Sequence, residues 1–293
     1  MTINHKHLML LMVLAMLGWG GSWPIAKFLS AYITEHEIVT YRYALTTLSM
    51  LPMLIFMRLS IKINIKSLLL IVIVGVLLIF YTKLFFLGTK FGTAGLAGAL
   101  VTTLMPIIVF VLMLFSRQTK PNLKDWLALI LGVIGVLTMM NIWSFQLNEV
   151  LSTSNIYLLW AALCWALMSI VSSYAKSVHP VVASFYIYLV ATVVDYFVFF
   201  EPSSGSILSM GHLFWVNFLI LVFVSTTFAT SMYFYGVQNL GSNKASVFTF
   251  LVPFFAIGLS IIFLDETLKL TTIVGVIMTI IALSILNNVK YKK

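Results

Sequence analysis

Long apolar segments alternate with short polar connections along the whole chain. A helix of about 20 apolar residues is long enough to cross the roughly 30 Å hydrocarbon core of a bilayer. The segments of this kind cover residues 8–29, 37–57, 67–89, 93–115, 123–142, 155–175, 181–200, 213–236, 244–264 and 270–288. The pattern therefore predicts an all-α integral membrane protein with ten transmembrane helices.

The second half of the chain repeats short motifs of the first half. Each pair below shares residue types, and the spacing between partners stays nearly constant. The pairs are Ala-Met-Leu-Gly-Trp19 with Ala-Ala-Leu-Cys-Trp165, Thr102-Thr-Leu-Met-Pro106 with Thr249-Phe-Leu-Val-Pro253, and Gly132-Val-Ile134 with Gly275-Val-Ile277. A duplication with small changes in the loops explains this pattern.

The duplication predicts two five-helix repeats, residues 1–146 and 155–293. Because each repeat has an odd number of predicted spans, the two repeats should lie in the membrane in opposite orientations. Inverted repeats place a binding site near the bilayer midplane and allow it to face each side in turn. The repeat therefore indicates a transporter.

Composition argues against a soluble domain, a disulfide-stabilised protein and a metal-binding protein. Of the 293 residues, 61% are hydrophobic and 9% are charged, whereas soluble domains have about 25% charged residues. The single cysteine, Cys164, excludes an intrachain disulfide and a thiolate metal cluster, and the five histidines have no ligand spacing. We therefore expect no metal and no cofactor.

The positive charges indicate the orientation of the chain. With the N-terminus in the cytoplasm, twelve of the seventeen Lys and Arg residues fall in cytoplasmic segments and three in outer segments, and Arg42 and Lys83 fall within spans. Lys and Arg gather on the cytoplasmic side of membrane proteins. We therefore predict a multi-pass protein of the cell (inner or plasma) membrane with both termini in the cytoplasm. The net charge of +9 reflects this orientation and not a nucleic-acid partner.

Polar and aromatic stripes on four helices mark a candidate binding site. Helical spacing places the members of each stripe on one helix face, and such faces are costly in lipid unless they meet other helices or water. The predicted substrate-binding residues from these stripes are Trp19, Trp23, Lys27, Trp165, Tyr188 and Tyr233. The alternative is that the Trp and Tyr residues are anchors at the membrane interface.

Lys83 and Asp195 are charged residues within predicted spans. Lys83 lies roughly 10 Å from the outer end of its helix, at 1.5 Å per residue. We predict that it binds substrate, and the alternative is that it extends to the membrane surface. Asp195 could pair with Lys83 or take up a proton as a coupling group, or it could be an interfacial aspartate. Arg42 is interpreted as an interface residue near Glu35 and Glu37.

Two prolines occupy corresponding positions in the fourth and ninth predicted helices, Pro106 and Pro253. Proline interrupts the hydrogen bonds of a helix, and such interruptions are tolerated in membrane helices. Their repetition predicts a pair of hinges, and a simple kink without function is the alternative.

Several segments of the chain together resemble the EamA family of the drug/metabolite transporter superfamily. They are Leu17-Gly-Trp-Gly-Gly-Ser-Trp-Pro-Ile-Ala-Lys27, Tyr41-Arg-Tyr43, Phe85-Phe-Leu-Gly-Thr-Lys-Phe-Gly-Thr-Ala94, Tyr233-Phe-Tyr-Gly-Val-Gln-Asn-Leu-Gly-Ser-Asn-Lys-Ala245 and Phe263-Leu-Asp-Glu-Thr267. The resemblance implies a central cavity between the halves, with the fifth and tenth helices outside it. It also implies small metabolites as substrates, such as amino acids or their derivatives, often exported. The family usually carries a Glu after its fourth and ninth helices. Here Glu266 matches the second, whereas Arg117-Gln118 stands at the first.

We therefore predict a secondary transporter that exports a small anionic or zwitterionic metabolite by alternating access. Its expected partners are the substrate and the lipid bilayer, and it is expected to be a monomer or a homodimer. A passive channel or a membrane scaffold is the alternative. An integral-membrane enzyme is disfavoured because the eight acidic residues are dispersed along the chain.

Overall fold

A computed structural model describes residues 5–115, 123–144, 146–174, 178–199, 207–240, 248–267 and 269–287. Within these ranges all regular secondary structure is helical. The helices are α1 (His5–Leu29), α2 (Glu35–Phe56), α3 (Ile65–Phe91), α4 (Ala94–Phe115), α5 (Leu123–Met139), η1 (Ile142–Ser144), α6 (Leu147–Val150), α7 (Thr153–Ser173), α8 (Pro180–Val198), η2 (Ile207–Ser209), α9 (His212–Leu219), η3 (Ile220–Phe228), α10 (Ala229–Leu240), α12 (Leu251–Leu264) and α13 (Leu270–Asn287). The predicted all-helical fold is confirmed for the described residues.

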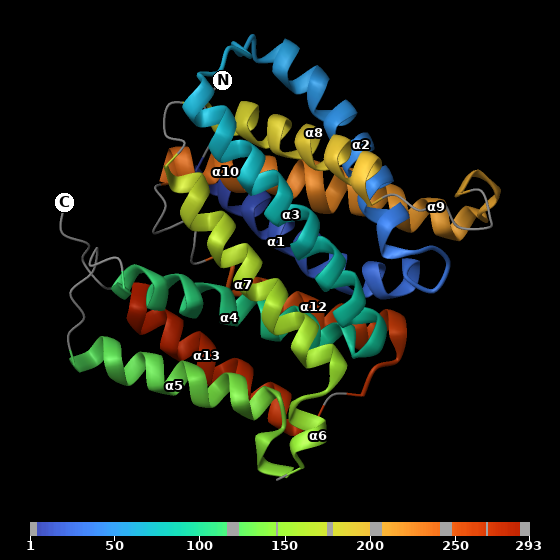
Figure 1. The fold of residues 1–293 in the computed structure, drawn as a ribbon. Coiled ribbons are helices and arrows are strands. Elements are labelled where there is room, and N and C mark those ends of the chain that lie inside the picture. The colour runs from blue at the N-terminus through green and yellow to red at the C-terminus, as the bar shows by residue number, and fades with distance from the viewer. Residues whose placement is uncertain are drawn as a thin grey trace.

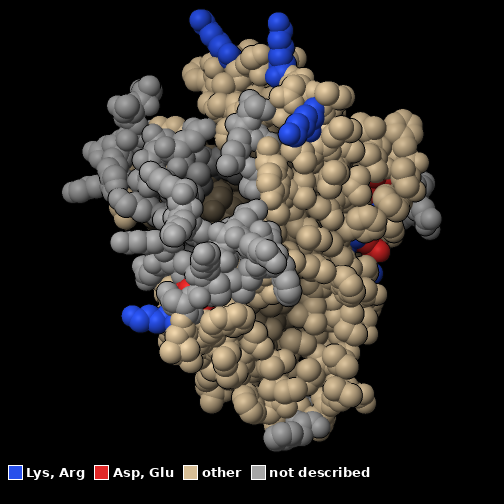
Figure 2. Space-filling view, turned by 60° about the vertical axis from the view of Figure 1, so that its left-hand side comes forward, with Lys and Arg blue, Asp and Glu red and all other residues tan. Residues whose placement is uncertain are grey.

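Seven helical segments are long and apolar enough to cross a membrane. They are α1, α2, α3, α4, α7, α8 and the continuous segment His212–Tyr233, and α12 and α13 are shorter apolar helices. Large apolar side chains such as Leu127 and Ile130 of α5 and Ile277 of α13 are about half exposed, at 58%, 55% and 53%. In Figure 2, Lys and Arg project mainly at the upper end and another basic side chain projects at the lower left, while few other charged atoms interrupt the described surface. The chain is therefore a multi-pass membrane protein.

The helices begin at residues suited to helix starts. Thr34 accepts a hydrogen bond from the backbone N–H of Glu37, whose carboxylate in turn accepts one from the backbone N–H of Thr34. Asn64 starts α3 and Ser152 starts α7 in a similar way, each by accepting a backbone N–H. Such caps satisfy backbone donors that have no partner within the helix.

The predicted helix at 213–236 is present, but its middle winds differently from an α-helix. α9, η3 and α10 follow one another without a break, and the nine residues of η3 form a π-helix. Here the hydroxyls of Thr226 and Thr227 donate to the carbonyls of Leu221 and Val222, five residues earlier. π-helical turns are rare and occur frequently at functional sites, and in this one Ser225 and Thr226 are buried.

The two halves of the chain pack against each other in matched pairs of helices (Figure 1). α3 packs on α7 as α1 packs on η3 and α10, and α4 packs on α7 as α1 packs on α12. α3 also packs on α8 as α2 packs on η3. Three further pairs, α2 with α8, α4 with α12 and α5 with α13, each join a helix to its own counterpart in the other half. These principal contacts are preserved when the halves are exchanged, as in an approximate twofold relation. Others, such as α4 with α13 and α1 with α4, have no counterpart of similar extent among the described residues.

The contact between α5 and α13 depends on two glycines. A Cβ atom on Gly275 would lie 2.5 Å from the carbonyl oxygen of Gly135, and one on Gly135 would lie 2.9 Å from the carbonyl oxygen of Gly275. Small residues allow membrane helices to approach closely enough for backbone packing. This pair holds the last helix of one half against the last helix of the other, at the side of the molecule (Figure 1).

Candidate functional site

A cavity of about 530 Å³ lies between the two halves of the chain. Residues of α1, α2, α3 and α4 line it from the first half, and residues of α7, α8, η3, α10, α12 and α13 line it from the second. Ligand pockets for small molecules have volumes of about 300–1,000 Å³. The cavity is therefore large enough for a small metabolite, and its walls come from both halves.

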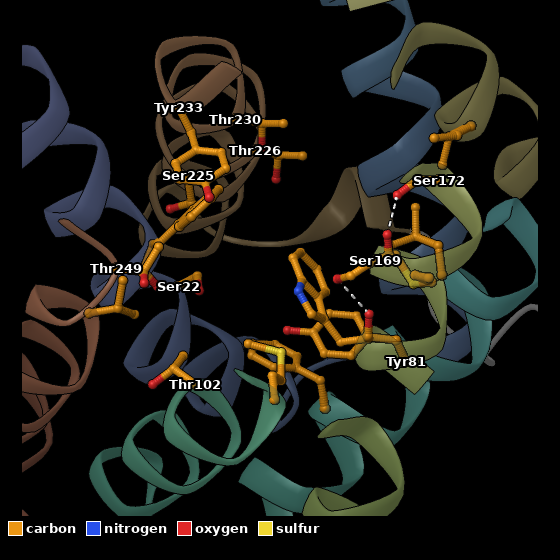
Figure 3. Close-up of a pocket in the computed structure, with 18 of the residues that line it drawn as sticks. Ser22, Tyr81, Thr102, Ser169, Ser172, Ser225, Thr226, Thr230, Tyr233 and Thr249 are labelled. Carbon is orange, nitrogen blue, oxygen red and sulfur yellow. Dashed lines mark hydrogen bonds between the residues drawn. The ribbon is translucent and has the colours of Figure 1, made fainter. Parts of the chain in front are cut away.

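Aromatic rings form much of the cavity wall (Figure 3). Trp19 of α1 packs on Tyr233 of α10 with ring centroids 5.1 Å apart, and Tyr81 of α3 packs on Trp165 of α7 at 4.8 Å. Each of these contacts joins the two halves. Aromatic side chains provide large, rigid apolar surfaces, and tyrosine adds a polar group at its edge. The wall is thus suited to a ligand that has an apolar or aromatic portion.

Many of the residues that line the cavity carry hydroxyl groups. Ser22 and Ser169 donate to the carbonyls of Trp19 and Trp165 in their own helices, which leaves their oxygens free to accept. Ser184 also lines the cavity. Figure 3 labels most of the Ser and Thr residues around the open centre: Ser22, Thr102, Ser169, Ser172, Ser225, Thr226, Thr230 and Thr249. The hydroxyl of Ser225 differs, because it is buried and has no hydrogen-bond partner among the described residues.

Arg42 is the one charged side chain among the described residues that line the cavity. Its Nε and Nη2 donate to the hydroxyl oxygen of Thr226 at 3.1 and 2.9 Å. The interpretation of Arg42 as an interface residue near Glu35 and Glu37 is therefore wrong. Glu37 caps the start of α2 instead. The signal that could have identified Arg42 was its position within a predicted span.

The structure brings together five of the seven predicted substrate-binding residues. The residues that line the cavity are Trp19, Trp23, Trp165, Tyr188 and Tyr233. Lys27 and Lys83 do not line it, and neither does Asp195. Sequence reasoning did not select Tyr81 and Phe85, although Phe85 contacts Trp23 with ring centroids 4.3 Å apart. Both lie in an almost uniformly apolar helix, where no polar stripe marks the buried face.

Lys83 pairs with Asp195 beside the cavity. The Lys83 Nζ lies 2.8 Å from Asp195 Oδ1, and Asp195 Oδ2 accepts a hydrogen bond of 2.6 Å from the Thr40 hydroxyl. The Lys83 ammonium also lies 3.9 Å from the centroid of the Phe199 ring. Of the roles considered for Asp195, the geometry is that of a partner for Lys83. The charge of Lys83 is thereby neutralised within the protein and does not face the cavity.

Lys27 lies in a second cluster, at the start of α4. Its Nζ is 2.9 Å from Glu266 Oε1 and 2.6 Å from the Gly92 carbonyl oxygen. The Glu266 carboxylate also accepts the backbone N–H groups of Ala94 and Gly95 at 2.8 and 3.0 Å. A carboxylate at a helix N-terminus satisfies free N–H groups and interacts favourably with the helix dipole. Glu266, from the second half, therefore caps a helix of the first half, while Arg117-Gln118 lies outside the described residues.

The two predicted hinge prolines have different surroundings. Pro106 lies inside α4 and lines the cavity. Pro253 lies in the first turn of α12, directly after a turn at Thr249 and Phe250, and is buried. A proline in the first turn of a helix removes no helical hydrogen bond. The break in the second half is therefore the turn before Pro253 and not a kink at the proline itself.

Among the residues that the structure describes, no group of three His, Cys, Asp or Glu side chains is placed to hold a metal ion. The chemistry of the cavity is that of a binding site, with apolar rings, hydroxyls and one guanidinium. It contains no pair of a nucleophile and a base, or of two carboxylates, among its described lining residues.

Comparisons with known proteins agree with this architecture. The EamA-like transporter family matches residues 7–141 and again residues 152–288. The Uncharacterized transporter YyaM of Bacillus subtilis (strain 168) is 24% identical over 271 residues, which cover 89% of this chain and 87% of YyaM. One crystal structure of a protein, 14% identical in sequence, covers 97% of each chain with a TM-score of 0.65, and so shares the fold. A family match in both halves, together with the all-helical fold, shows that the chain belongs to the EamA-like transporter family.

Proposed function

We propose that the protein is a secondary transporter that exports a small anionic or zwitterionic metabolite, such as an amino acid or a derivative, across the cell membrane. The observation that carries this proposal is the composition of the cavity wall. Aromatic rings from both halves surround a space of about 530 Å³, and Arg42 is the one charged group among its described lining residues. An isolated cation beside aromatic surfaces favours a ligand with an apolar portion and a negative charge.

The proposed mechanism is alternating access between two inverted repeats. Ten membrane crossings, five in each repeat, would give the repeats opposite orientations, and the matched principal helix contacts support a structural repeat. A site between such repeats opens to one side and then the other when one half moves against its partner. We place the flexing points at Pro106 and at the turn before Pro253. The membrane is the inner or plasma membrane, with both termini cytoplasmic.

The roles of the charged residues follow from their contacts. Arg42 takes the place that the sequence suggested for Lys27 and Lys83, because both lysines already have carboxylate partners. We therefore assign Lys27 and Lys83 to the contacts between the halves, and Trp19, Trp23, Trp165, Tyr188 and Tyr233 to the substrate. No coupling ion is assigned to Asp195, whose carboxylate is occupied by Lys83 and Thr40.

Counterflow in proteoliposomes tests the proposal. Purified protein is first tested by thermal shift against a library of metabolites, and a stabilising compound is then preloaded into vesicles. A carrier accelerates the entry of the labelled compound when the unlabelled compound is inside. Entry without this acceleration would indicate a channel, and chemical conversion of the compound would indicate an enzyme.

Two tryptophans of α7 provide a matched pair for the same assay. Trp165 lines the cavity and contacts Tyr81, whereas Trp160 is 56% exposed on the outer surface. Counterflow should be lost or strongly reduced in Trp165→Ala and retained in Trp160→Ala, because only Trp165 can contact a ligand in the cavity. Equal counterflow activity of the two variants would show that transport does not use the cavity lined by Trp165.

A further inference from the structure

The guanidinium of Arg42 has hydrogen-bond donors that the protein does not use. A guanidinium carries five N–H groups, and the contacts of Arg42 in the described structure use Nε and Nη2, both directed at the Thr226 hydroxyl. Lys27 and Lys83 each pair with a carboxylate, whereas no described carboxylate lies within ion-pair distance of Arg42. Arg42 is therefore a cation in a cavity wall without a counter-ion from the described residues.

Thr226 fixes the position of this guanidinium. Its side chain is only 3% exposed, and its hydroxyl donates to the Leu221 carbonyl at 2.8 Å. Because that proton is committed to Leu221, the lone pairs of the hydroxyl oxygen accept from Arg42. The hydrogen bond of Thr226 spans five residues of the π-helical segment η3. The unusual winding of η3 thus holds the acceptor that orients Arg42.

Ser225, next to Thr226, lines the same cavity with an unused hydroxyl. The residue is 2% exposed, and its Oγ has no hydrogen-bond partner among the described residues. Leaving a buried hydroxyl unpaired is unfavourable, so a position of this kind in a cavity wall indicates a ligand that completes the bond. Figure 3 shows Ser225 among the labelled groups around the centre of the cavity.

We propose that Arg42 and Ser225 bind the carboxylate of the substrate, with Thr226 as the positioning residue. Arg42 would donate two parallel N–H···O bonds, the arrangement in which arginine recognises carboxylates, and Ser225 would donate its O–H. A single cation matches the single charge of a carboxylate, whereas a phosphate dianion would leave charge unbalanced in the cavity. This inference rests on the proposed transport function and names the substrate class and the group that selects it.

The test measures binding by titration calorimetry with purified protein and matched probes. The probes are 3-phenylpropionate and L-phenylalanine. Each is compared with the corresponding amide, in which the carboxylate is replaced by an uncharged group. Inorganic phosphate is a separate probe. The wild type should bind at least one carboxylate more tightly than its amide. Arg42→Gln should weaken carboxylate binding by about 10- to 100-fold and leave amide binding nearly unchanged, and Arg42→Lys should restore only part of the loss.

Ser225→Ala gives a readout that a purely structural role would not produce. The thermal stability of the ligand-free protein should rise or stay the same, because an unpaired buried hydroxyl is removed, while carboxylate affinity falls. Lys90→Gln, which removes an exposed cation, is the matched control for Arg42→Gln. It should change neither thermal stability nor carboxylate affinity. Cooperative melting of each variant shows that it is folded.

Three outcomes would overturn the inference. They are carboxylate binding by folded Arg42→Gln at wild-type affinity, preferential binding of phosphate, and failure of the wild type to bind any carboxylate of the panel. Counterflow distinguishes an error in the carboxylate site from an error in the proposed transport function. A protein that exchanges an uncharged compound remains a transporter without a carboxylate site, whereas absence of counterflow for every stabilising compound contradicts transport itself.

Discussion

The ammonium of Lys83 lies 2.8 Å from a carboxylate oxygen of Asp195, and the two residues belong to different halves of the chain. Asp195 is fully buried, with an exposed fraction of 0%, and Lys83 is 9% exposed. Because Thr40 also donates to Asp195, the cluster connects α2, α3 and α8. A buried ion pair of this kind contributes little net stability when complete, but loss of one partner leaves an uncompensated charge.

We expect Lys83→Met and Asp195→Asn each to lower thermal stability strongly. Removing one partner of a buried pair costs about 3–5 kcal/mol, whereas replacing both can be nearly neutral. The double variant Lys83→Met/Asp195→Asn should therefore melt at a higher temperature than either single variant, in thermal unfolding of the detergent-solubilised protein. Lys90→Met, at an exposed position, is the control for loss of a lysine. A Lys83→Met protein as stable as the wild type would show that the pair is not required.

Glu266 should stabilise the start of α4 through its charge. Glu266→Gln removes the ion pair with Lys27 and weakens the bonds to the N–H groups of Ala94 and Gly95. Charge at a helix N-terminus contributes about 0.3–1 kcal/mol, and up to about 2 kcal/mol when partly buried. We therefore expect a measurable fall in melting temperature. Asp265→Asn is the control in the same turn, because Asp265 is exposed and Asn tolerates its positive φ of 50°.

Two Gly→Ala substitutions should differ in their effects on stability. A methyl group at Gly275 would lie 2.5 Å from the Gly135 carbonyl oxygen, whereas one at Gly258 would meet nothing within 4 Å. Gly275→Ala should separate α5 from α13 and lower the melting temperature. Gly258→Ala should leave it unchanged or raise it, because alanine is favoured over glycine in a helix by about 0.5–1 kcal/mol. The same sign for both changes would contradict the packing described for Gly275.

Pro106→Ala should affect transport more than binding. Pro106 lies within α4 and interrupts its hydrogen bonds where the helix lines the cavity. If this interruption serves the movement between states, restoring a regular helix should slow counterflow while equilibrium affinity stays near that of the wild type. Equal loss of affinity and counterflow would point to a role in folding or in the shape of the cavity.

Labelling of single cysteines should establish the orientation of the chain. In a Cys164→Ala background, Ala31→Cys in the connection from α1 to α2 should react with an impermeant maleimide added to intact cells. Ser60→Cys, in the connection from α2 to α3, should react only after the cells are opened. Both positions are exposed in the structure. The reverse pattern would place the N-terminus outside.

The sequence by itself determined the helices and their approximate ends. Contact with lipid requires a long apolar run in each membrane-spanning segment. This requirement is local, so it can be recognised directly in the amino-acid sequence. For that reason predicted segments such as 67–89 and 93–115 agree closely with α3 (Ile65–Phe91) and α4 (Ala94–Phe115). The aromatic and hydroxyl stripes that line the cavity could be recognised for a related reason. A polar face on a membrane helix is costly in lipid, so it must face other helices or water.

The tertiary structure decided the partners of the charged residues. Lys83 and Asp195 are 112 positions apart in the chain, and Lys27 and Glu266 are 239 apart. Nothing in the local pattern around either lysine shows that a carboxylate lies opposite it. Arg42 differs from both lysines in what faces it, the hydroxyl of Thr226 on a π-helical turn. Electrostatic pairing depends on distances in space, which the sequence does not give. This pairing distinguishes Arg42, the cation of the cavity, from Lys27 and Lys83, which form ion pairs between the two halves.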